Sequence, residues 1–524
     1  MSEGFDSYTK ELFDALFKET SATAEVPAEV RERIGQLFER AKSSENLTQP
    51  IVDLFLELLN AAKNFKASPE AFGIKREELV ALARKHEEID EHHVTIGGRV
   101  MRAIPIVEEA NRRVEEYLRL KDVEAPSGIE LWDQIQKNME RIKKRLGMTD
   151  EEWNTFNGQL KHAINTVEEL AKVIDLPEDA IRDVARVTQH YRMRISPYYA
   201  SLIMPGKIND PVLLQSVPTG EMIDNAGIEI PPVAADHSPA RLIDQFYPRV
   251  VAVKITNMCA MYCTHCLRIA HIGKKDRIYP KDTYKEALNY IRKNERIRDV
   301  LLTGGDALML PNHLLKWILD QLLEIDHVRM IRLGTRIPVT VPQRIDDELL
   351  DILEYVNDKK PVRVVTQINT AQEITPVSKE AFKKISKRVS AILNQAVLLK
   401  GINDSKVKMW KLCETIQEAY VRPYYVFNCS YRNPQFAHFR VPVEVGRDII
   451  ESMYGNISGD AIPRYIATAG GKVPLHRSNV MGRADNRVIL RKPWDGTIAE
   501  YPDADPEKYF CDDKFAFAKY NWNR

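Results

Sequence analysis

The chain has 524 residues, enough to bury a large core and to form two or three domains. Basic and acidic residues are equal, at 75 each, so bulk charge gives no argument for a nucleic-acid or anionic-membrane partner. The sequence shows no apolar run near the roughly 18 residues of a membrane-spanning helix and no signal-peptide pattern at its amino terminus, which predicts a cytoplasmic protein with neither kind of partner.

The first third of the chain has a helical pattern. Apolar residues recur at helical spacing from Ser7 to about Leu202, with almost no strand-like alternation. We expect residues 1–145 to form a helical N-terminal extension and residues 146–245 to form a helical region that leads into the core. The charged helical faces are interpreted as solvated surface, and no residue here suggests chemistry.

Two hydroxyl residues mark helix starts within this region. Ser127 is followed by Glu130, and Thr149 is followed by Glu152. In each pair the hydroxyl and the carboxylate can satisfy free backbone N–H groups of a first turn, as in a capping box. The pairs predict breaks near residues 126 and 149.

Short β-branched runs alternate with amphipathic stretches from Tyr247 onward. After a first gap the runs recur about every 30 residues, the length of a βαβ unit. They favour an α/β fold, a partial or complete parallel (β/α) barrel over residues 246–435, rather than a two-layer Rossmann sheet. The runs are VVAVKIT, RDVLLTGG, VRMIRLGT, VRVVTQI, VSAILNQAVLL and VRPYYVFN.

Residues suited to chemistry directly follow several of these runs. Active sites of parallel barrels lie at the carboxyl ends of the strands. We therefore expect four groups to meet at that edge: the cysteine-rich segment after VVAVKIT, Gly304–Asp306, Gly334–Arg336 and Asn428–Cys429.

Three of the six cysteines fall within eight positions. Cys259, Cys263 and Cys266 form the pattern C-x3-C-x2-C directly after the first barrel strand. Three thiolates can hold a [4Fe–4S] cluster and leave one iron open for a non-protein ligand, whereas electron-transfer clusters use four cysteines. The pattern predicts chemistry at an open iron. The alternatives are a zinc site with His265 as its fourth ligand, or an accidental group of buried thiols.

This cysteine pattern, after the first strand of an α/β barrel, resembles the signature of the radical S-adenosylmethionine (SAM) superfamily. In that superfamily SAM chelates the open iron and is cleaved to a 5′-deoxyadenosyl radical. Gly304, Gly305 and Asp306 resemble its glycine-glycine-acid motif, in which glycines permit close backbone approach and the acid pairs with the methionyl ammonium. The resemblance also makes His265 a candidate SAM-binding residue.

Longer segments resemble the lysine 2,3-aminomutase family, in the same order, from about residue 150 to about residue 500. The resemblance implies an isomerase that moves nitrogen between the α- and β-carbons of an amino acid, with a [4Fe–4S] cluster, SAM and pyridoxal 5′-phosphate (PLP). It also implies a reductant such as flavodoxin or ferredoxin, and a homo-oligomer. The matching segments include ISPYYASLI, MYCTHCLR, RDVLLTGGDALML, GTRIPVTVPQRI, NQAVLLKGIND, VRPYYVFNC, HFRVPVEVGRDIIE and AGGKVPL.

The same resemblance assigns roles to single residues. Lys472, within the C-terminal segment 436–524, holds the position of the lysine that forms the internal aldimine with PLP, and a primary amine suits that chemistry. Arg268 matches the arginine that fixes the substrate carboxylate, a task for a planar two-pronged cation. Further candidates for PLP or SAM are Arg249, Arg336, Gln343 and Asn394.

The positions that select the substrate side chain depart from lysine-specific members. Those members place two aspartates around the distal ammonium of lysine, and here Ser430 and Thr468 stand in their places. A buried lysine ammonium without these carboxylates would be unpaired, at a considerable cost. Arg432 can instead receive an acidic side chain, as in the glutamate 2,3-aminomutase branch. We expect glutamate or another amino acid rather than lysine as substrate.

Two other functions fit parts of the pattern. A radical SAM enzyme that modifies a lysine of a protein, such as a translation factor, would use the same barrel and dock its partner on the helical extension. A non-catalytic metal-bound scaffold would be a colourless zinc protein. Near the end of the chain Cys511 stands alone, so no second zinc segment is expected, and Cys413 and Cys429 are interpreted as ordinary buried residues.

Overall fold

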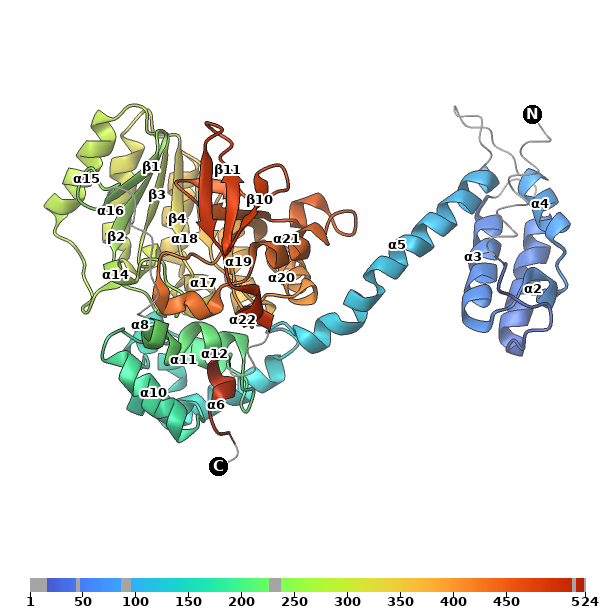
Figure 1. Cartoon of the computed structure of the whole chain (residues 1–524), viewed down its shortest axis with the longest axis horizontal. Helices are drawn as coiled ribbons and strands as arrows, with labels where there is room; N and C mark the ends of the chain where they lie inside the picture. Colours follow the sequence, from blue (N-terminus) through green and yellow to red (C-terminus); the bar gives the residue numbers. More distant parts are fainter. Residues whose placement is uncertain (1–16, 44–47, 86–95, 226–236, 511–514, 523–524) are drawn as a thin grey trace. The chain divides into compact units, whose positions relative to one another are not determined.

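The chain folds into two compact units, Met1–Glu116 and Tyr117–Arg524 (Figure 1). Helix α5 (Ile96–Glu124) runs through the division between them, so the boundary expected near residue 145 lies within the second unit. The computed structural model describes residues 17–43, 48–85, 96–225, 237–510 and 515–522. Cys511 lies outside these ranges.

The N-terminal unit is helical, in agreement with its sequence pattern. Apolar side chains of its helices form a core of their own, which includes the fully buried Ile34, Leu54 and Leu58. The other two apolar cores belong to the second unit. The elements are α2 (Ala28–Ser43), α3 (Thr48–Phe65), η1 (Pro69–Phe72) and α4 (Arg76–Lys85).

The second unit begins with a layer of short helices. Both predicted capping boxes form: the Thr149 hydroxyl accepts from the Glu152 N–H at 3.1 Å, and Ser127 accepts from Glu130 at 3.3 Å, with each glutamate accepting in return. The layer comprises α6 (Trp132–Leu146), α7 (Asp150–Trp153), α8 (Phe156–Lys161), α9 (Val167–Val173), α10 (Glu178–Thr188), α11 (Pro197–Ser201), α12 (Pro211–Ser216) and α13 (Glu221–Asp224).

A nine-stranded sheet follows, and its strands pair in sequence order. Strands β2 to β8 run parallel, while β1 and β9 are antiparallel edges. The sheet is a half-barrel, so the prediction of a partial parallel barrel is confirmed. Its strands are β1 (Ile243–Tyr247), β2 (Val250–Thr256), β3 (Asp299–Gly304), β4 (Met330–Gly334), β5 (Val362–Thr366), β6 (Ala391–Leu398), β7 (Arg422–Asn428), β8 (Arg464–Thr468) and β9 (Lys472–Pro474).

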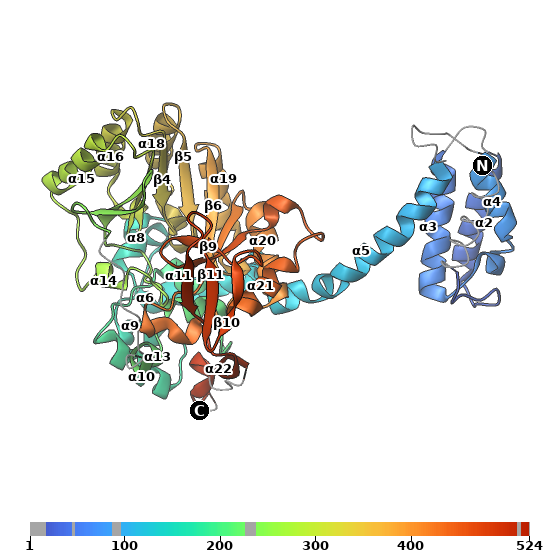
Figure 2. The same cartoon turned by 45° about the horizontal axis from the view of Figure 1, so that its top comes forward.

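Helices that alternate with the parallel strands cover the outer face of the sheet (Figure 2). Beyond the barrel, a three-stranded antiparallel sheet shares the main apolar core through Val488, Leu490 and Tyr501. The outer helices are α15 (Lys281–Lys293), α16 (Asn312–Leu323), α18 (Asp347–Asn357), α19 (Pro376–Ser386), α20 (Lys406–Glu418) and α21 (Val443–Glu451); the small sheet contains β10 (Val480–Ala484), β11 (Arg487–Arg491) and β12 (Ile498–Pro502).

The layer of short helices lies against the carboxyl ends of the parallel strands (Figure 1). The Ser196 hydroxyl donates to the Thr340 carbonyl after β4, and the Gln372 amide after β5 donates to the Leu202 carbonyl at 2.7 Å. Residues of both parts share one apolar core. The helical region therefore forms one wall of the edge at which chemistry was expected.

None of the helices in the described part of the chain is both long and apolar enough to cross a lipid bilayer.

The three cysteines of the C-x3-C-x2-C pattern, Lys472 and the barrel core all belong to the second unit. Deletion of residues 1–85 should therefore leave the uptake of the cluster and of PLP intact. We expect the shortened chain to take up iron, sulfide and PLP in the same amounts per chain as the full chain, measured by metal analysis and visible absorbance. Loss of either cofactor in a monodisperse shortened protein would contradict this separation of the units.

Candidate active site

The loop that carries Cys259, Cys263 and Cys266, called the cysteine loop below, follows β2 and forms hydrogen bonds with the helical layer on one side and with the Gly304–Gly305 turn on the other. The backbone N–H groups of Tyr262 and Thr264 donate to the carbonyls of Arg194 and Gln215, each at 3.0 Å, which ties the loop to the helical layer. The three cysteines of the loop are free and half-buried. A loop of this kind can wrap around a metal cluster that is partly shielded from water.

Gly304 and Gly305 press directly against the start of this loop. The Gly305 N–H donates to the Thr256 carbonyl at 2.6 Å, and the Asp306 N–H donates to the Met258 carbonyl at 2.8 Å. A Cβ on Gly305 would lie 2.3 Å from the Met258 carbonyl oxygen, and Gly304 has a φ of +113°. Only glycine fits this close approach without displacing the backbone.

The carboxylate of Asp306 connects the glycine turn to the turn after β4. It is buried and accepts hydrogen bonds from the backbone N–H groups of Leu308, at 3.0 Å, and Arg336, at 2.6 Å. Burial raises the pKa of Asp306. Asp306 thus joins the turns after β3 and β4, while contact with a methionyl ammonium stays a prediction.

Burial also raises the pKa values of two of the cysteines. It raises the pKa of Cys266 to about 12, with a further contribution from Cys263, and it raises the pKa of Cys259 well above its usual range. Without a metal, the thiols of Cys259 and Cys266 are therefore protonated near neutral pH. Cluster assembly must release these protons, so it is favoured as the pH rises.

Arg336 carries a buried positive charge to the cysteine loop. Its guanidinium donates to the Cys263 sulfur at 2.8 Å and forms an ion pair with Glu373, whose side chain is fully buried. The Nε atom of Arg336 is buried without a hydrogen-bond partner among the described residues. Arg336, predicted to contact PLP or SAM, thus lies beside the cluster position, where an unpaired N–H group suits an anionic ligand.

His265 lies in the same buried layer. Its Nε2 is 3.3 Å from the Asn369 amide nitrogen, while its Nδ1 has no hydrogen-bond partner in the described chain. Burial, together with the charge of Arg336, lowers the pKa of His265 to about 3, so the ring is neutral. Its role toward SAM stays a prediction.

Arg268 is half-buried just beyond the last cysteine of the pattern. Its guanidinium donates to the Thr303 hydroxyl, at the end of β3, at 3.0 Å. Arg268 therefore lies at the expected edge of the sheet, two residues from Cys266. Its other donors are available for a substrate carboxylate, as the sequence predicts.

Lys472 begins β9, directly after a hairpin turn at Gly470 and Gly471. Gly470 has a φ of +72°, which glycine adopts readily, and the Ala469 N–H closes the turn on the Gly471 carbonyl at 2.9 Å. The Lys472 N–H donates to the Tyr247 hydroxyl at 3.0 Å. A direct contact thus joins β1 and β9, the two edge strands.

The amine of Lys472 lies among aromatic rings. Its Nζ is 4.7 Å from the ring centre of Tyr425 and 5.6 Å from that of Phe427. Burial and, as a smaller contribution, the nearby charge of Arg332 together lower the pKa of Lys472 to about 8. A substantial fraction of the amine is therefore neutral and nucleophilic near physiological pH.

Arg332 was not among the residues predicted from sequence. It projects from β4, is half-buried, and its Nε is buried without a hydrogen-bond partner in the described residues. The charged groups of Arg332 and Lys472 lie close enough to interact. A lone arginine within the otherwise apolar run MIRL was the available signal.

The three other residues proposed from the sequence as PLP or SAM ligands lie in different parts of the second unit. The side-chain amide of Asn394 accepts from the Ile368 N–H and donates to the Ile368 carbonyl, so this side chain holds the segment just after β5, and its contacts give no support for a cofactor role. Arg249 is exposed before β2, at the amino edge of the parallel strands. Gln343 lies after α17 (Ile337–Thr340), with a buried, unpartnered amide oxygen.

The residues predicted to select the side chain of the substrate lie at the carboxyl edge of the parallel sheet. β7 and β8 pair in parallel, with Phe427 opposite Ile466, which places Ser430 and Thr468 at the carboxyl ends of neighbouring strands. Thr468 is also paired with Lys472 across the β8–β9 hairpin. Arg432 is half-buried close to Ser430, whose hydroxyl accepts from the Arg432 N–H at 3.2 Å.

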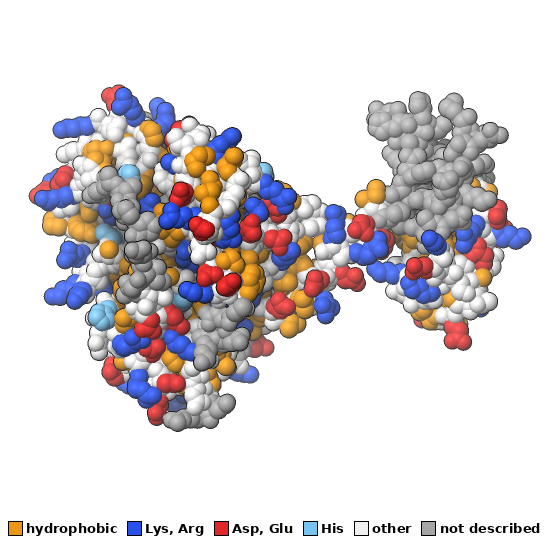
Figure 3. Space-filling model, in the orientation of Figure 1, with side chains coloured by type: hydrophobic (Ala, Val, Ile, Leu, Met, Phe, Trp, Pro, Cys, Tyr) orange, Lys and Arg blue, Asp and Glu red, His pale blue; other side chains and the backbone are white. Residues whose placement is uncertain are grey.

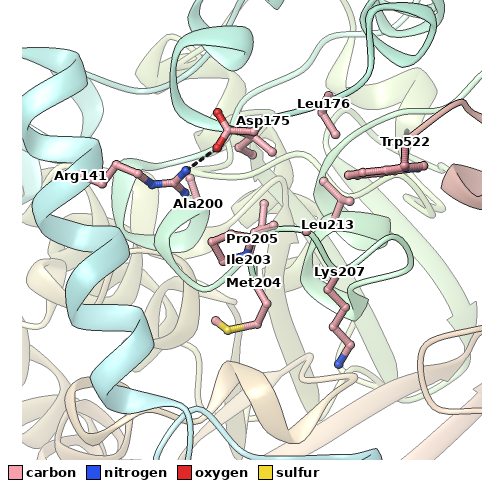
Figure 4. Close-up of a pocket in the computed structure, with 12 residues that line it drawn as sticks. Arg141, Asp175, Leu176, Ala200, Ile203, Met204, Pro205, Lys207, Leu213 and Trp522 are labelled. Atoms are coloured by element: carbon pink, nitrogen blue, oxygen red, sulfur yellow. Dashed lines mark hydrogen bonds and ion pairs between the residues drawn. The ribbon is translucent and has the colours of Figure 1, made fainter. Parts of the chain in front are cut away.

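These groups fit two cofactors. Three free, half-buried thiols near the Arg336 Nε–H and the His265 Nδ1, neither of which has a hydrogen-bond partner among the described residues, suit an iron–sulfur cluster with a polar ligand on its open iron. The Lys472 amine, part of which is neutral near physiological pH, and the nearby Arg332, whose Nε has no hydrogen-bond partner among the described residues, suit an aldehyde that carries a phosphate. The small hollow in Figure 4, lined by Met204, Leu213 and Trp522 within the helical layer, contains none of these residues.

Comparisons with known proteins assign the barrel and the C-terminal segment to two family models. Residues 253–411 match the model of the radical SAM superfamily, and residues 450–521 match that of lysine-2,3-aminomutase. The chain is 39% identical to the glutamate 2,3-aminomutase of Clostridioides difficile over 75% of this chain and 93% of that protein. It is 38% identical to the L-lysine 2,3-aminomutase of Fusobacterium nucleatum over 71% and 88%, respectively.

Replacing Gly305 with alanine should prevent cluster assembly, because the added Cβ would displace the start of the cysteine loop. We expect Gly305→Ala to hold less than half of the wild-type iron and sulfide after anaerobic reconstitution. Gly482→Ala is the matched control, since a Cβ there meets nothing within 4 Å. Wild-type iron content in Gly305→Ala would contradict the packing argument.

The pKa of Lys472 predicts how PLP attachment depends on pH. Protonated amine cannot attack the aldehyde, so the rate of attachment to PLP-free protein should rise with pH to a midpoint near 8, rather than near the ordinary value of 10.5. Adducts trapped with borohydride and counted by mass spectrometry measure the rate. Arg332→Met removes the neighbouring charge and should move the midpoint upward; an unchanged midpoint would show that the two groups do not interact.

Proposed function

This chain belongs to the lysine 2,3-aminomutase family of radical SAM enzymes, and we propose that its substrate is an amino acid with an acidic side chain, glutamate first. It is an isomerase that uses a [4Fe–4S] cluster, SAM and PLP. When bound, the cluster and SAM supply the radical, and PLP supplies the carbonyl that holds the migrating nitrogen.

The residues of the chain bind and orient the reactants. We infer that Cys259, Cys263 and Cys266 hold the cluster and that Lys472 provides the amine that attaches PLP. Arg332, which lies near Lys472 and whose Nε has no hydrogen-bond partner in the described part of the chain, suits the PLP phosphate. Arg268, beside the cysteine loop, suits the substrate carboxylate. The protein's main task is to orient these groups and to exclude water.

The observation that carries the substrate proposal is the pair of hydroxyls at the ends of β7 and β8. Ser430 and Thr468 cannot neutralise a distal ammonium, and Arg432 beside them is a cation. Transfer of an unpaired ammonium into a buried site costs several kcal/mol, in the range of about 2–5. An acidic side chain would instead gain a partner in Arg432. The matches to glutamate and lysine enzymes are almost equal in identity and do not distinguish these substrates.

We also infer a homo-oligomer that receives electrons from a protein reductant in the reducing environment of the cytoplasm. Support for self-association comes from helix α5, where Ile106 and Leu118 are 70% and 56% exposed, because exposed apolar side chains on a long helix favour pairing with another helix. A protein-bound lysine is the alternative substrate. The N-terminal unit, which has a core of its own, offers a place for such a partner.

The substrate proposal is tested by turnover. Enzyme reconstituted anaerobically is incubated with SAM, dithionite and single free amino acids, and β-amino acids are identified by mass spectrometry. We expect β-glutamate as the main product, its loss in Lys472→Ala, and at least a tenfold lower yield in Arg432→Met.

The selectivity can also be reversed by placing carboxylates at the two strand ends. The double variant Ser430→Asp, Thr468→Asp should lose glutamate turnover and gain preference for lysine, because it restores two partners for a distal ammonium. Efficient lysine turnover by the wild-type chain would overturn the proposal. Cleavage of SAM without turnover of any free amino acid would favour the protein-bound lysine.

A further inference from the structure

The segment that follows the cysteine loop combines exposed apolar and basic side chains. Leu267, next to Cys266, is 55% exposed, and Ile278 is 48% exposed. Between them the exposed side chains of Lys274, Lys275 and Arg277 add three positive charges. The segment therefore presents apolar and basic side chains together on the surface.

This segment is fixed firmly to the cluster loop. Asn257, which is buried two residues before Cys259, donates to the carbonyls of Ile272 and Lys275, both at 2.8 Å, and accepts from the Arg277 N–H at 2.7 Å. Ile278 is paired with Thr256, the last residue of β2. The segment therefore keeps one arrangement relative to the cluster ligands.

The segment has little negative charge to offset its cations. Residues 267–281 contain five lysine and arginine residues and a single carboxylate, Asp276. That carboxylate already forms ion pairs with Arg192, at 2.5 Å, and Arg194, at 2.8 Å. In the described part of the chain, no carboxylate is paired with Lys274, Lys275 or Arg277. Basic side chains also line the edge that carries α14 (Ile269–Ile272) and the start of α15 (Figure 3).

On the basis of the proposed function, which requires one electron for the cluster, we propose that residues 267–278 form the docking surface for a small acidic one-electron carrier protein. Exposed apolar side chains within a basic rim match an interface with a partner of opposite charge. The surface is small, as weak and transient redox contacts are. One electron leaves the reduced carrier and enters the cluster, so the carrier is oxidised and the cluster reduced by one electron.

The position of the surface suits this task. Leu267 is covalently attached to the cluster ligand Cys266, and Asn257 links the basic loop to the start of the loop that holds Cys259. A carrier docked here would thus approach the cluster from the side of its own ligands. Charge attraction would also steer the two proteins together and make the association sensitive to salt.

The test compares a protein reductant with a chemical one. In Lys274→Glu, Lys275→Glu, Arg277→Glu, the second-order rate constant for cluster reduction by reduced flavodoxin, followed by stopped-flow loss of cluster absorbance, should fall at least tenfold. The acceleration of the wild-type reaction at low ionic strength should also disappear. Complete reduction and SAM cleavage in excess dithionite should match the wild-type protein.

A matched control reverses the charge of three exposed lysines at the opposite edge of the sheet. Lys359, Lys384 and Lys387 lie in the segments that precede β5 and β6, at the amino ends of these strands. Their replacement by glutamate changes net charge equally but should leave the flavodoxin rate within twofold of wild type. If the triple variant loads no cluster, Lys275→Glu and Arg277→Glu, measured separately, provide the same comparison.

Two results would overturn the docking surface: an unchanged flavodoxin rate in the triple variant, or an equal loss of rate in the control. Failure of the proposed function would look different. In that case wild-type protein with a dithionite-reduced cluster would cleave no SAM, whereas the rates of cluster reduction by flavodoxin would still separate the two charge-reversed variants.

Discussion

The candidate site depends on the close contact between the cysteine loop and the Gly304–Gly305 turn. The backbone of Gly305 lies directly on the carbonyl of Thr256, so the end of β3 sets the path of the loop that leaves β2. The Asp306 carboxylate then links the glycine turn to the turn after β4, because it accepts a hydrogen bond from the Arg336 N–H. Three neighbouring strand ends are thereby held together, and the loop that carries the cysteines leaves β2 from a fixed position.

Charge at this edge of the sheet is predominantly positive. Arg336 lies against Cys263 with Glu373 as its buried partner, which stabilises an arginine that would otherwise be costly to bury. Arg332 and Lys472 have no carboxylate partner among the described residues, and the charge of Arg332 contributes to the lowered pKa of Lys472. An enzyme that binds an anionic cofactor and an amino-acid carboxylate gains from such unpaired cations, because the ligands complete the pairs.

Much of this arrangement could be predicted from the sequence because it depends on local pattern. The β-branched runs gave six strands in order, and the spacing of Cys259, Cys263 and Cys266 indicated the cluster loop. Residues whose role depends on tertiary contacts were harder to interpret. Asn394 is a strand residue whose side chain bonds the backbone of Ile368, just beyond β5, and the influence of Arg332 on Lys472 joins residues 140 positions apart in the sequence. The helices of residues 146–245 were predicted from their pattern, whereas their position over the strand ends left no local signal, because it depends on contacts such as that between Gln372 and Leu202.

In an intramolecular amino shift, the substrate keeps its own nitrogen while that nitrogen moves to the adjacent carbon. Incubation of the reconstituted enzyme with glutamate labelled with ¹⁵N at the α-amino group, in the presence of unlabelled ammonium, tests this shift. We expect β-glutamate that retains all of the label. A β-product that has exchanged its nitrogen with ammonium, or no β-product while SAM is cleaved, would contradict it.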